Sequence, residues 1–490
     1  MRYCMGIVVL ASLGLSAGPS ALGCSLPEGP VPPADEPPGR TSCFRGYLGL
    51  DQGISLSHGG DFCKTVAMAS TTIPRPTPEQ LAWQKAGLGV FFHFGVNTFA
   101  GKEWSDGTIP AADFAPSDLD VDEWVRMARD LGAAYVVLTA KHHDGFCLWP
   151  TATTDYSVAS SPWKNGRGDV VREIADACRK HDMKLGLYLS PWDRNAPQYE
   201  DAEAYDEFYL AQLRELCTNY GPLYELWFDG AGSAGREYAW DRIGELIDEL
   251  QPGAMVFNMG PATIRWVGNE DGLASDPVEY VTTSADLNNY DDDVVETEQA
   301  RYLPPECDVS LRRGWFWQPG EEPKSLPHLL AIHDRSIGLG ASLLLNIPPD
   351  RRGRIDPADK ARSLEFGQAL RDRFGSPHEG TLAVTGNGVD VDLGGARQLD
   401  HIELCERLED GQRITSHRIL DGEGTLLAEG RTVGVRRIHR LEQPVTVSAL
   451  RIETVGEGAV IERVVVHDAA DAPVPDLADA YRAPTEEPDS

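Results

Sequence analysis

The chain has 490 residues with the glycine, proline and apolar content of a globular protein, so its length predicts one large domain and a smaller one. Its 76 acidic and 44 basic residues give a formal net charge of -32 and are spread along the chain, which argues against nucleic acid and anionic membranes as partners. A neutral or small polar ligand suits this charge better.

The N-terminal 75 residues carry targeting and linker patterns. Arg2 precedes a short apolar stretch that leads through small residues to Cys24, which is typical of a signal peptide or lipoprotein signal over 1–24. This stretch is too short to span a bilayer, so we expect no transmembrane segment, with Cys24 as a candidate lipid anchor. Residues 25–75 are interpreted as a low-complexity linker or as an extension from a miscalled start. With residue 1 as the true start, the protein is expected to be secreted, periplasmic or a surface lipoprotein; with Met68 as the start, it is expected to be cytoplasmic.

The nine cysteines contain no CxxC pair, so the sequence indicates neither a zinc knuckle nor a disulfide framework. We expect most of them to be small buried apolar side chains. Cys43 and Cys63 could pair with each other outside the main domain.

From residue 76, apolar runs of four to eight residues alternate with segments of helical period. The predicted strands are LGVFFHF, AAYVVLTA, KLGLYLS, YELWFD, AMVFNM and ASLLLNIP, and the predicted helices include 201–219 and 236–250. Continuous apolar strands between amphipathic helices predict an α/β fold with a covered parallel sheet, which suits a (β/α)8-type (TIM-like) barrel over 76–378. A doubly wound open sheet is the main alternative, but no Gly-rich phosphate fingerprint follows the first strand.

Beyond about residue 380 the helical period gives way to short alternating runs such as HIELCERL and ERVVVHD, separated by Gly and Asp turns. This pattern predicts a C-terminal antiparallel β-sandwich over 379–470. Residues 471–490 are expected to form a disordered acidic tail.

Polar side chains follow several of the predicted strands. His93 follows LGVFF, Lys141 to Asp144 follow AAYVVLTA, Tyr188 follows KLGL, and Asp229 follows YELWF. Ionisable side chains are rarely found at the ends of packed strands without a functional role. The carboxyl ends of barrel strands form the active-site face of this fold. The sequence therefore predicts an active site at these strand ends.

The adjacent histidines need a particular backbone. Within a strand His142 and His143 would point to opposite sides, so both can face a ligand only if the strand has already turned into a loop. Asp229, followed by Gly230, suits a nucleophile or acid, although an ordinary turn-initiating aspartate is the alternative. A metal site on His142, His143 and Asp144 is the rival functional interpretation.

Two loop segments combine a carboxylate with an aromatic ring, Glu103-Trp104 and Arg265 to Glu270, and a third, Arg313 to Trp317, supplies further aromatic rings. Such pairs suit a pyranose, which has hydroxyl rims and an apolar C–H face. Two carboxylates converging on a pocket of histidines, tyrosine and tryptophans predict glycoside hydrolysis.

The series FFHFG, GKEW, LTAKHHDGF, LGLYLS, LWFDG, RWVGNEDG, ECDVSLRRGWFW and LLLNIPPDRRG resembles the family 29 glycoside hydrolases, the retaining α-L-fucosidases. With GQRITSHRIL and TVGVRRI, which resemble that family's β-sandwich, the similarity covers about residues 77 to 468. RWVGNE and the following aromatics are most similar to the subgroup that prefers α-1,3 and α-1,4 fucosyl linkages.

The resemblance implies an exo-acting fucosidase without metal or organic cofactor, acting on fucosylated oligosaccharides or glycoconjugates. It implies that Asp229 is the nucleophile and Glu270 the general acid/base, with Glu306 or Glu279 as alternatives to Glu270. The substrate-binding positions it implies are His93, Glu103, Trp104, His142, His143, Tyr188, Trp227 and Trp315. A catalytically inactive, lectin-like fucose-binding protein is the alternative from another functional class.

Overall fold

The computed structural model describes residues 73–286, 294–469 and 473–477. The predicted signal segment with Cys24, the Cys43 and Cys63 pairing, the Met68 start, and most of the linker and tail lie outside these residues. The five described cysteines are free and buried, as expected: Cys147, Cys178, Cys217, Cys307 and Cys405. In the described part of the chain, no helix is both long enough and apolar enough to cross a membrane.

Eight parallel strands form a nearly closed barrel, which confirms the predicted TIM-like architecture. Their order is β5-β4-β3-β2-β1-β10-β9-β6, and a parallel bridge from Phe257 to Ile264 brings the two end strands together. The strands are β1 (Leu88–Phe92), β2 (Tyr135–Lys141), β3 (Lys184–Leu189), β4 (Glu225–Trp227), β5 (Met255–Phe257), β6 (Arg265–Trp266), β9 (Pro305–Ser310) and β10 (Ser342–Asn346).

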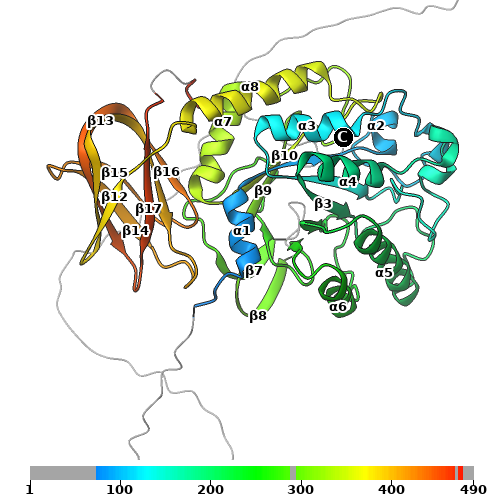
Figure 1. Cartoon of the computed structure of the whole chain (residues 1–490). Coiled ribbons are helices and arrows are strands. Elements are labelled where there is room, and N and C mark those ends of the chain that lie inside the picture. Colours follow the sequence, from blue (N-terminus) through cyan, green and yellow to red (C-terminus); the bar gives the residue numbers. More distant parts are fainter. Residues whose placement is uncertain (1–72, 287–293, 470–472, 478–490) are drawn as a thin grey trace, which may run out of the picture. The chain divides into compact units, whose positions relative to one another are not determined.

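Helices cover the outside of the barrel (Figure 1). They are α1 (Pro78–Ala86), α2 (Val96–Ala100), α3 (Val121–Leu131), α4 (Val170–His181), α5 (Ala202–Asn219), α6 (Trp240–Leu250), α7 (Leu326–Arg335) and α8 (Pro357–Phe374), with 3-10 turns η1 (Ala111–Asp113), η2 (Val158–Ser160), η3 (Trp163–Gly166) and η4 (Ile337–Leu339). The predicted helices 201–219 and 236–250 correspond to α5 and α6.

Two consecutive crossovers depart from the strict β/α repeat. The described link between β5 and β6 contains no helix, and a hairpin of β7 (Val281–Asp286) and β8 (Val294–Tyr302) is inserted between β6 and β9. In that link, the Asn258 side chain donates a hydrogen bond to the Asp286 carbonyl, and the Ala262 carbonyl accepts one from Arg301 of the hairpin. The hairpin therefore packs where a crossover helix would otherwise lie.

Alternation along each strand separates two apolar cores. In β2, Val136 and Leu138 belong to the layer between strands and helices, whereas Tyr135 and Val137 fill the barrel interior. Trp83 of α1 joins the interior cluster, which otherwise consists of residues from the strands and their ends. The interior is therefore packed, as the layered core of such barrels requires.

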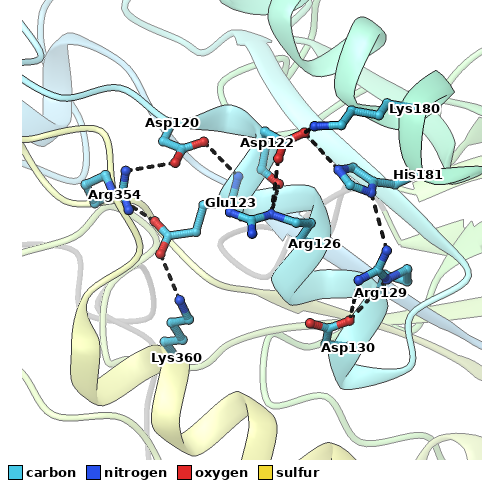
Figure 2. A network of polar contacts seen from close by, with 10 residues as sticks. All are labelled: Asp120, Asp122, Glu123, Arg126, Arg129, Asp130, Lys180, His181, Arg354 and Lys360. Atoms are coloured by element: carbon cyan, nitrogen blue, oxygen red, sulfur yellow. Dashed lines mark hydrogen bonds and ion pairs between the residues drawn. The ribbon is translucent and has the colours of Figure 1, made fainter.

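A network of charged side chains joins α3 to its neighbours on the outside of the barrel (Figure 2). Arg354 reaches both Asp120, the N-cap of α3, and Glu123, and Lys360 of α8 also contacts Glu123. Asp122 accepts from Lys180 and His181 at the end of α4. Linked pairs of this kind hold neighbouring helices in register, although each exposed pair contributes little by itself.

The C-terminal strands form the predicted antiparallel sandwich. They are β11 (His378–Glu379), β12 (Thr381–Thr385), β13 (Gly388–Glu406), β14 (Ser416–Asp421), β15 (Leu426–Gly430), β16 (Arg437–Val455) and β17 (Ile461–His467). The pairing of β13 with β16 shifts register between Asp392 and Arg397, so the N-terminal part of β13 pairs with β12 and the C-terminal part with β17. These two long strands are therefore shared by both halves of the sandwich.

Candidate active site

The polar residues predicted at the strand ends come together at the carboxyl end of the barrel. The rings of His93 and His142 have centroids 5.7 Å apart, those of His142 and His143 are 4.2 Å apart, and Tyr188 stacks on His142 at 5.6 Å. Asp229 lies within hydrogen-bonding distance of Tyr188. Residues from β1, β2, β3 and β4 thus form one cluster, as the strand-end pattern predicted.

Asp229 is the carboxylate of this cluster. Its Oδ2 accepts a hydrogen bond from the Tyr188 hydroxyl at 2.9 Å and lies 3.4 Å from Nε2 of His143, while Oδ1 accepts from the Ala231 amide at 2.9 Å. Burial acts to raise the pKa of Asp229, but the charge and hydrogen bond of His143, with the Ala231 and Tyr188 donors, hold that pKa below its ordinary value. The side chain is 23% exposed. Asp229 is therefore an ionised carboxylate that a ligand can reach.

The hydrogen bonds of His143 define which of its nitrogens carry hydrogen. The Ser190 hydroxyl donates its only hydrogen to the carbonyl oxygen of Trp192 at 2.7 Å, so Ser190 accepts from Nδ1 of His143 at 2.8 Å. Nε2 faces the Asp229 carboxylate, where a bare lone pair would be repelled. Both ring nitrogens of His143 therefore face oxygen partners, Ser190 on one side and Asp229 on the other.

The four consecutive residues Lys141 to Asp144 divide between scaffold and site. Strand β2 ends at Lys141, so His142 and His143 lie in the following turn, and both rings contact Tyr188. Lys141 is instead buried between Asp193 and Gln212, each at 2.9 Å. Asp144 accepts from the Phe146 amide and from Asn97. The two histidines therefore belong to the site, and their two neighbours stabilise the loop.

His93 is held as a neutral imidazole. Its Nδ1 lies 3.0 Å from Oδ1 of Asn346, whose amide nitrogen donates to the Trp315 carbonyl, so Nδ1 of His93 must be the donor. Burial lowers the pKa of His93 to about 3, and burial also lowers that of His142 well below its ordinary value. Nε2 of His93 is thus an acceptor suited to a ligand hydroxyl.

Glu103 and Trp104 join this cluster to the aromatic loop. Glu103 accepts hydrogen bonds from the Trp315 amide at 2.7 Å and from Gln318 at 3.1 Å, and burial raises its pKa to about 7. The Trp104 ring stands edge-on to His143 at 5.5 Å, and Trp315 lies 5.0 Å from His93. Two of the three predicted loop segments, Glu103-Trp104 and Arg313 to Trp317, therefore meet the histidine cluster.

Trp227 belongs to the cluster that fills the barrel interior and also contacts Tyr188. It is 5% exposed, stacks on Tyr188 at 5.3 Å and on Phe257 at 3.9 Å, and donates from Nε1 to Glu306 at 3.0 Å. Trp227 therefore supports the ring of Tyr188 from the barrel interior.

The three candidates for the general acid/base occupy different environments. Glu270 is partly exposed in the loop after β6, and a bridge from Asp271 to Val309 holds this loop beside β9. Glu306 is fully buried and accepts from Tyr135 and Trp227. Glu279 is exposed beside Tyr280, which bonds to residues of the sandwich. Of the three, Glu270 is the one that lies partly exposed in the loop directly after a barrel strand.

A metal ion has one candidate ligand set within the described residues. His142, His143 and Asp229 offer ligand atoms that all lie within 4.8 Å of one another. Asp144, which the sequence-based metal interpretation included, is not a member of this set.

Several residues of the cluster were not predicted. Ser190 and Asn346 follow or end β3 and β10, so the same strand-end pattern could have identified them. Trp192, which contacts His143, lies in a loop and carries no such pattern, whereas Phe316, which contacts His142, belongs to the predicted aromatic segment Arg313 to Trp317.

The sequence model of the family described as Alpha-L-fucosidase matches residues 68–373. The chain belongs to the alpha-L-fucosidase family. It is therefore a glycoside hydrolase, as the resemblance in its motifs predicted.

Relatives of known sequence or structure agree with this family. Alpha-L-fucosidase 1 of Arabidopsis thaliana is 36% identical over 426 residues, which cover 78% of this chain and 84% of that protein. The crystal structure of a glycoside hydrolase 29 family member from an unknown rumen bacterium has a TM-score of 0.74 and 33% identity, and covers 84% of this chain and 80% of that one. A Ruminococcus gnavus GH29 fucosidase in complex with fucose has a TM-score of 0.69 and 30% identity, with 80% and 94% covered.

Proposed function

We propose that this chain removes terminal α-linked L-fucose from oligosaccharides or glycoconjugates by double displacement with retention of configuration. The observation that supports this best is the ionised, partly exposed Asp229 set among Tyr188 and three histidines, in a member of the alpha-L-fucosidase family. The crystal structure of the Ruminococcus gnavus fucosidase with fucose supports the choice of sugar.

In the first step, an oxygen of Asp229 attacks the anomeric carbon and the glycosidic bond breaks. Its electron pair goes to the leaving oxygen, which takes a proton from Glu270. In the second step, Glu270 removes a proton from water as the water attacks the same carbon, and Asp229 leaves as a carboxylate. The donors Tyr188, His143 and Ala231 favour both the ionised nucleophile and its departure, because all three bond to the charged form.

The sugar hydroxyls are bound by groups whose hydrogen-bonding roles follow from their protonation. Neutral His93 offers Nε2 as an acceptor, and Glu103 offers carboxylate oxygens when ionised. Trp104, placed beside His143, supplies an apolar surface for the C–H face of the ring.

We propose a preference for α-1,3 and α-1,4 linkages, because RWVGNE and the following aromatic segment are most similar to the subgroup with that preference. Residues 267–270 of the first segment and the aromatic segment lie in loops after barrel strands, where they can contact the sugar to which fucose is attached.

The test is incubation with oligosaccharides carrying α-1,2, α-1,3, α-1,4 or α-1,6 fucose, with NMR detection of the first anomer released. Release of α-L-fucose, mainly from the α-1,3 and α-1,4 substrates, is the expected result. Release of the β anomer would exclude double displacement. Binding of fucose without release from any substrate would favour the lectin-like alternative.

A further inference from the structure

Two glutamates inside the barrel are not used by the proposed mechanism. Glu225 of β4 and Glu306 of β9 are both 0% exposed and lie beneath Trp227 in the interior cluster. The hydrogen-bond donors described for them are neutral side chains: Trp83, Tyr135 and Trp227. Buried carboxylates normally need a cation or several donors, so this pair requires an explanation.

The hydrogen bonds of the pair leave one oxygen without a donor. Glu306 accepts from Tyr135 at 2.7 Å on Oε2 and from Trp227 at 3.0 Å on Oε1. Glu225 accepts from Trp83 at 3.0 Å on Oε2, whereas its buried Oε1 receives no hydrogen bond from any described donor. Glu225 also contacts Glu306. A proton on Oε1 of Glu225 could be donated to Glu306, which would give this oxygen a hydrogen-bond partner. Two neighbouring carboxyls in an apolar interior also cannot both be ionised, because their charges repel each other.

We propose that Glu225 and Glu306 share one proton and act together as positioning residues for Trp227. Trp227 donates to Glu306 and stacks on Tyr188, and Tyr188 in turn donates to Asp229. The pair thereby supports the floor of the site from within the barrel. The positioning role rests on the proposed function of Asp229, whereas the shared proton does not depend on it.

The surroundings of the pair determine its pH dependence. The titratable groups that interact with it are Tyr135 of β2, Tyr224 before β4, and Cys307 and Asp308 of β9. Of these, Cys307 lies in the layer between strands and helices. Burial, followed by the neighbouring carboxyl, raises the pKa of Glu225 well above its ordinary value, and burial raises that of Glu306. Carboxyls with a raised folded-state pKa contribute stability at low pH, and this contribution is lost as the pH rises through the folded pKa.

The substitution Glu225→Gln in the full chain tests the shared proton. A glutamine amide can donate permanently to Glu306, so the variant should unfold near the parent temperature at about pH 5 and lose less stability than the parent as the pH rises to about 9. Other buried carboxyls, such as Glu103 and Asp144, are present in both proteins and cancel in the difference. Glu245→Gln, at an exposed position of α6, should follow the parent at every pH. A Glu225→Gln curve parallel to that of the parent would overturn the shared proton.

Two substitutions of Glu306 test the positioning role. Glu306→Gln keeps an acceptor for Trp227 and should retain most activity on a fucoside, whereas Glu306→Leu removes it and should lower kcat/KM roughly tenfold. Equal activity of the two variants would overturn the positioning role. If Glu306→Leu does not fold, the unfolding curves of Glu225→Gln still decide on the shared proton. The two proposals can fail separately. If the parent protein hydrolyses no fucoside but the unfolding temperature of Glu225→Gln still depends less on pH than that of the parent, the proposed function fails and the shared proton remains supported.

Discussion

The Tyr188 hydroxyl donates to Oδ2 of Asp229 across 2.9 Å, and this bond links a ring from β3 to a carboxylate that follows β4. The bond stabilises the ionised form of Asp229, which is the form that a nucleophile needs. Tyr188 is itself fixed between the His142 and Trp227 rings, so its hydroxyl is presented without conformational freedom.

Tyr188→Phe should raise the pKa of Asp229 and shift the acid limb of the kcat/KM profile on an aryl α-L-fucoside to higher pH. Loss of a hydrogen bond to a charged group should also lower kcat/KM at the optimum by roughly tenfold. Tyr220→Phe is a matched control, because it removes a buried tyrosine–aspartate bond to Asp169 at the start of α4. An acid limb that moves equally in both variants, or in neither, would contradict the role of Tyr188.

Asp229→Gly should reduce turnover of an aryl α-L-fucoside by roughly a thousandfold or more, because the covalent step loses its nucleophile. Azide should restore part of the activity by occupying the vacated space and attacking the anomeric carbon. The measurement is release of the aryl group with and without azide, together with identification of the fucosyl azide. Unchanged activity of the variant would exclude Asp229 as the nucleophile.

Glu270→Ala should lose roughly a hundredfold or more of its activity on oligosaccharides, because their poor leaving groups need protonation. With an activated aryl fucoside, the rate of the first step, in which Asp229 becomes fucosylated, should fall much less. Pre-steady-state release of the aryl group measures the rate of that step. Glu279→Ala, at an exposed position outside the cluster, is the control and should behave like the parent. Equal losses on both substrate types would exclude Glu270 as the general acid/base.

Gly314→Ala should disturb sugar binding without unfolding the protein. A Cβ at this position would clash with Oε1 of Glu103, so the carboxylate would have to move away from its Trp315 and Gln318 donors. Displacement of this kind should lower kcat/KM by at least about tenfold. Gly253→Ala is the matched control, since nothing lies within 4 Å of its added carbon. Wild-type kinetics for Gly314→Ala would show that Glu103 does not orient the substrate.

Activity should survive prolonged dialysis against a strong chelator, because the proposed mechanism uses only protein groups. The alternative is a metal ion on His142, His143 and Asp229, whose ligand atoms are close enough to share one ion. Activity that is lost on chelation and restored by a divalent cation would favour this metal site over the Asp229 nucleophile.

Part of the site follows directly from patterns along the chain. His93, His142, Tyr188 and Asp229 were identified because each follows a continuous apolar run, and parallel strands bring such positions to one end of a barrel. Ser190 and Asn346 obey the same rule and could have been included.

The roles of neighbouring residues could not be separated in this way. Lys141 and Asp144 flank the two histidines in sequence, yet they bond to Asp193, Gln212, Asn97 and the Phe146 amide. Glu306 and Glu270 are both glutamates, so residue type alone does not distinguish them. The structure does, because Glu306 is buried beside Glu225 inside the barrel.

The amino-acid sequence alone determined the barrel, the sandwich and the strand ends at which the site forms, because apolar periodicity depends on local spacing. Only the tertiary structure decided which polar groups face the site, which support it, and which carboxyls meet inside the barrel. These roles depend on burial and on partners that are distant in the chain, such as Asn346 for His93 and Glu306 for Trp227. The physical reason is that the protonation and orientation of a side chain are set by its three-dimensional surroundings.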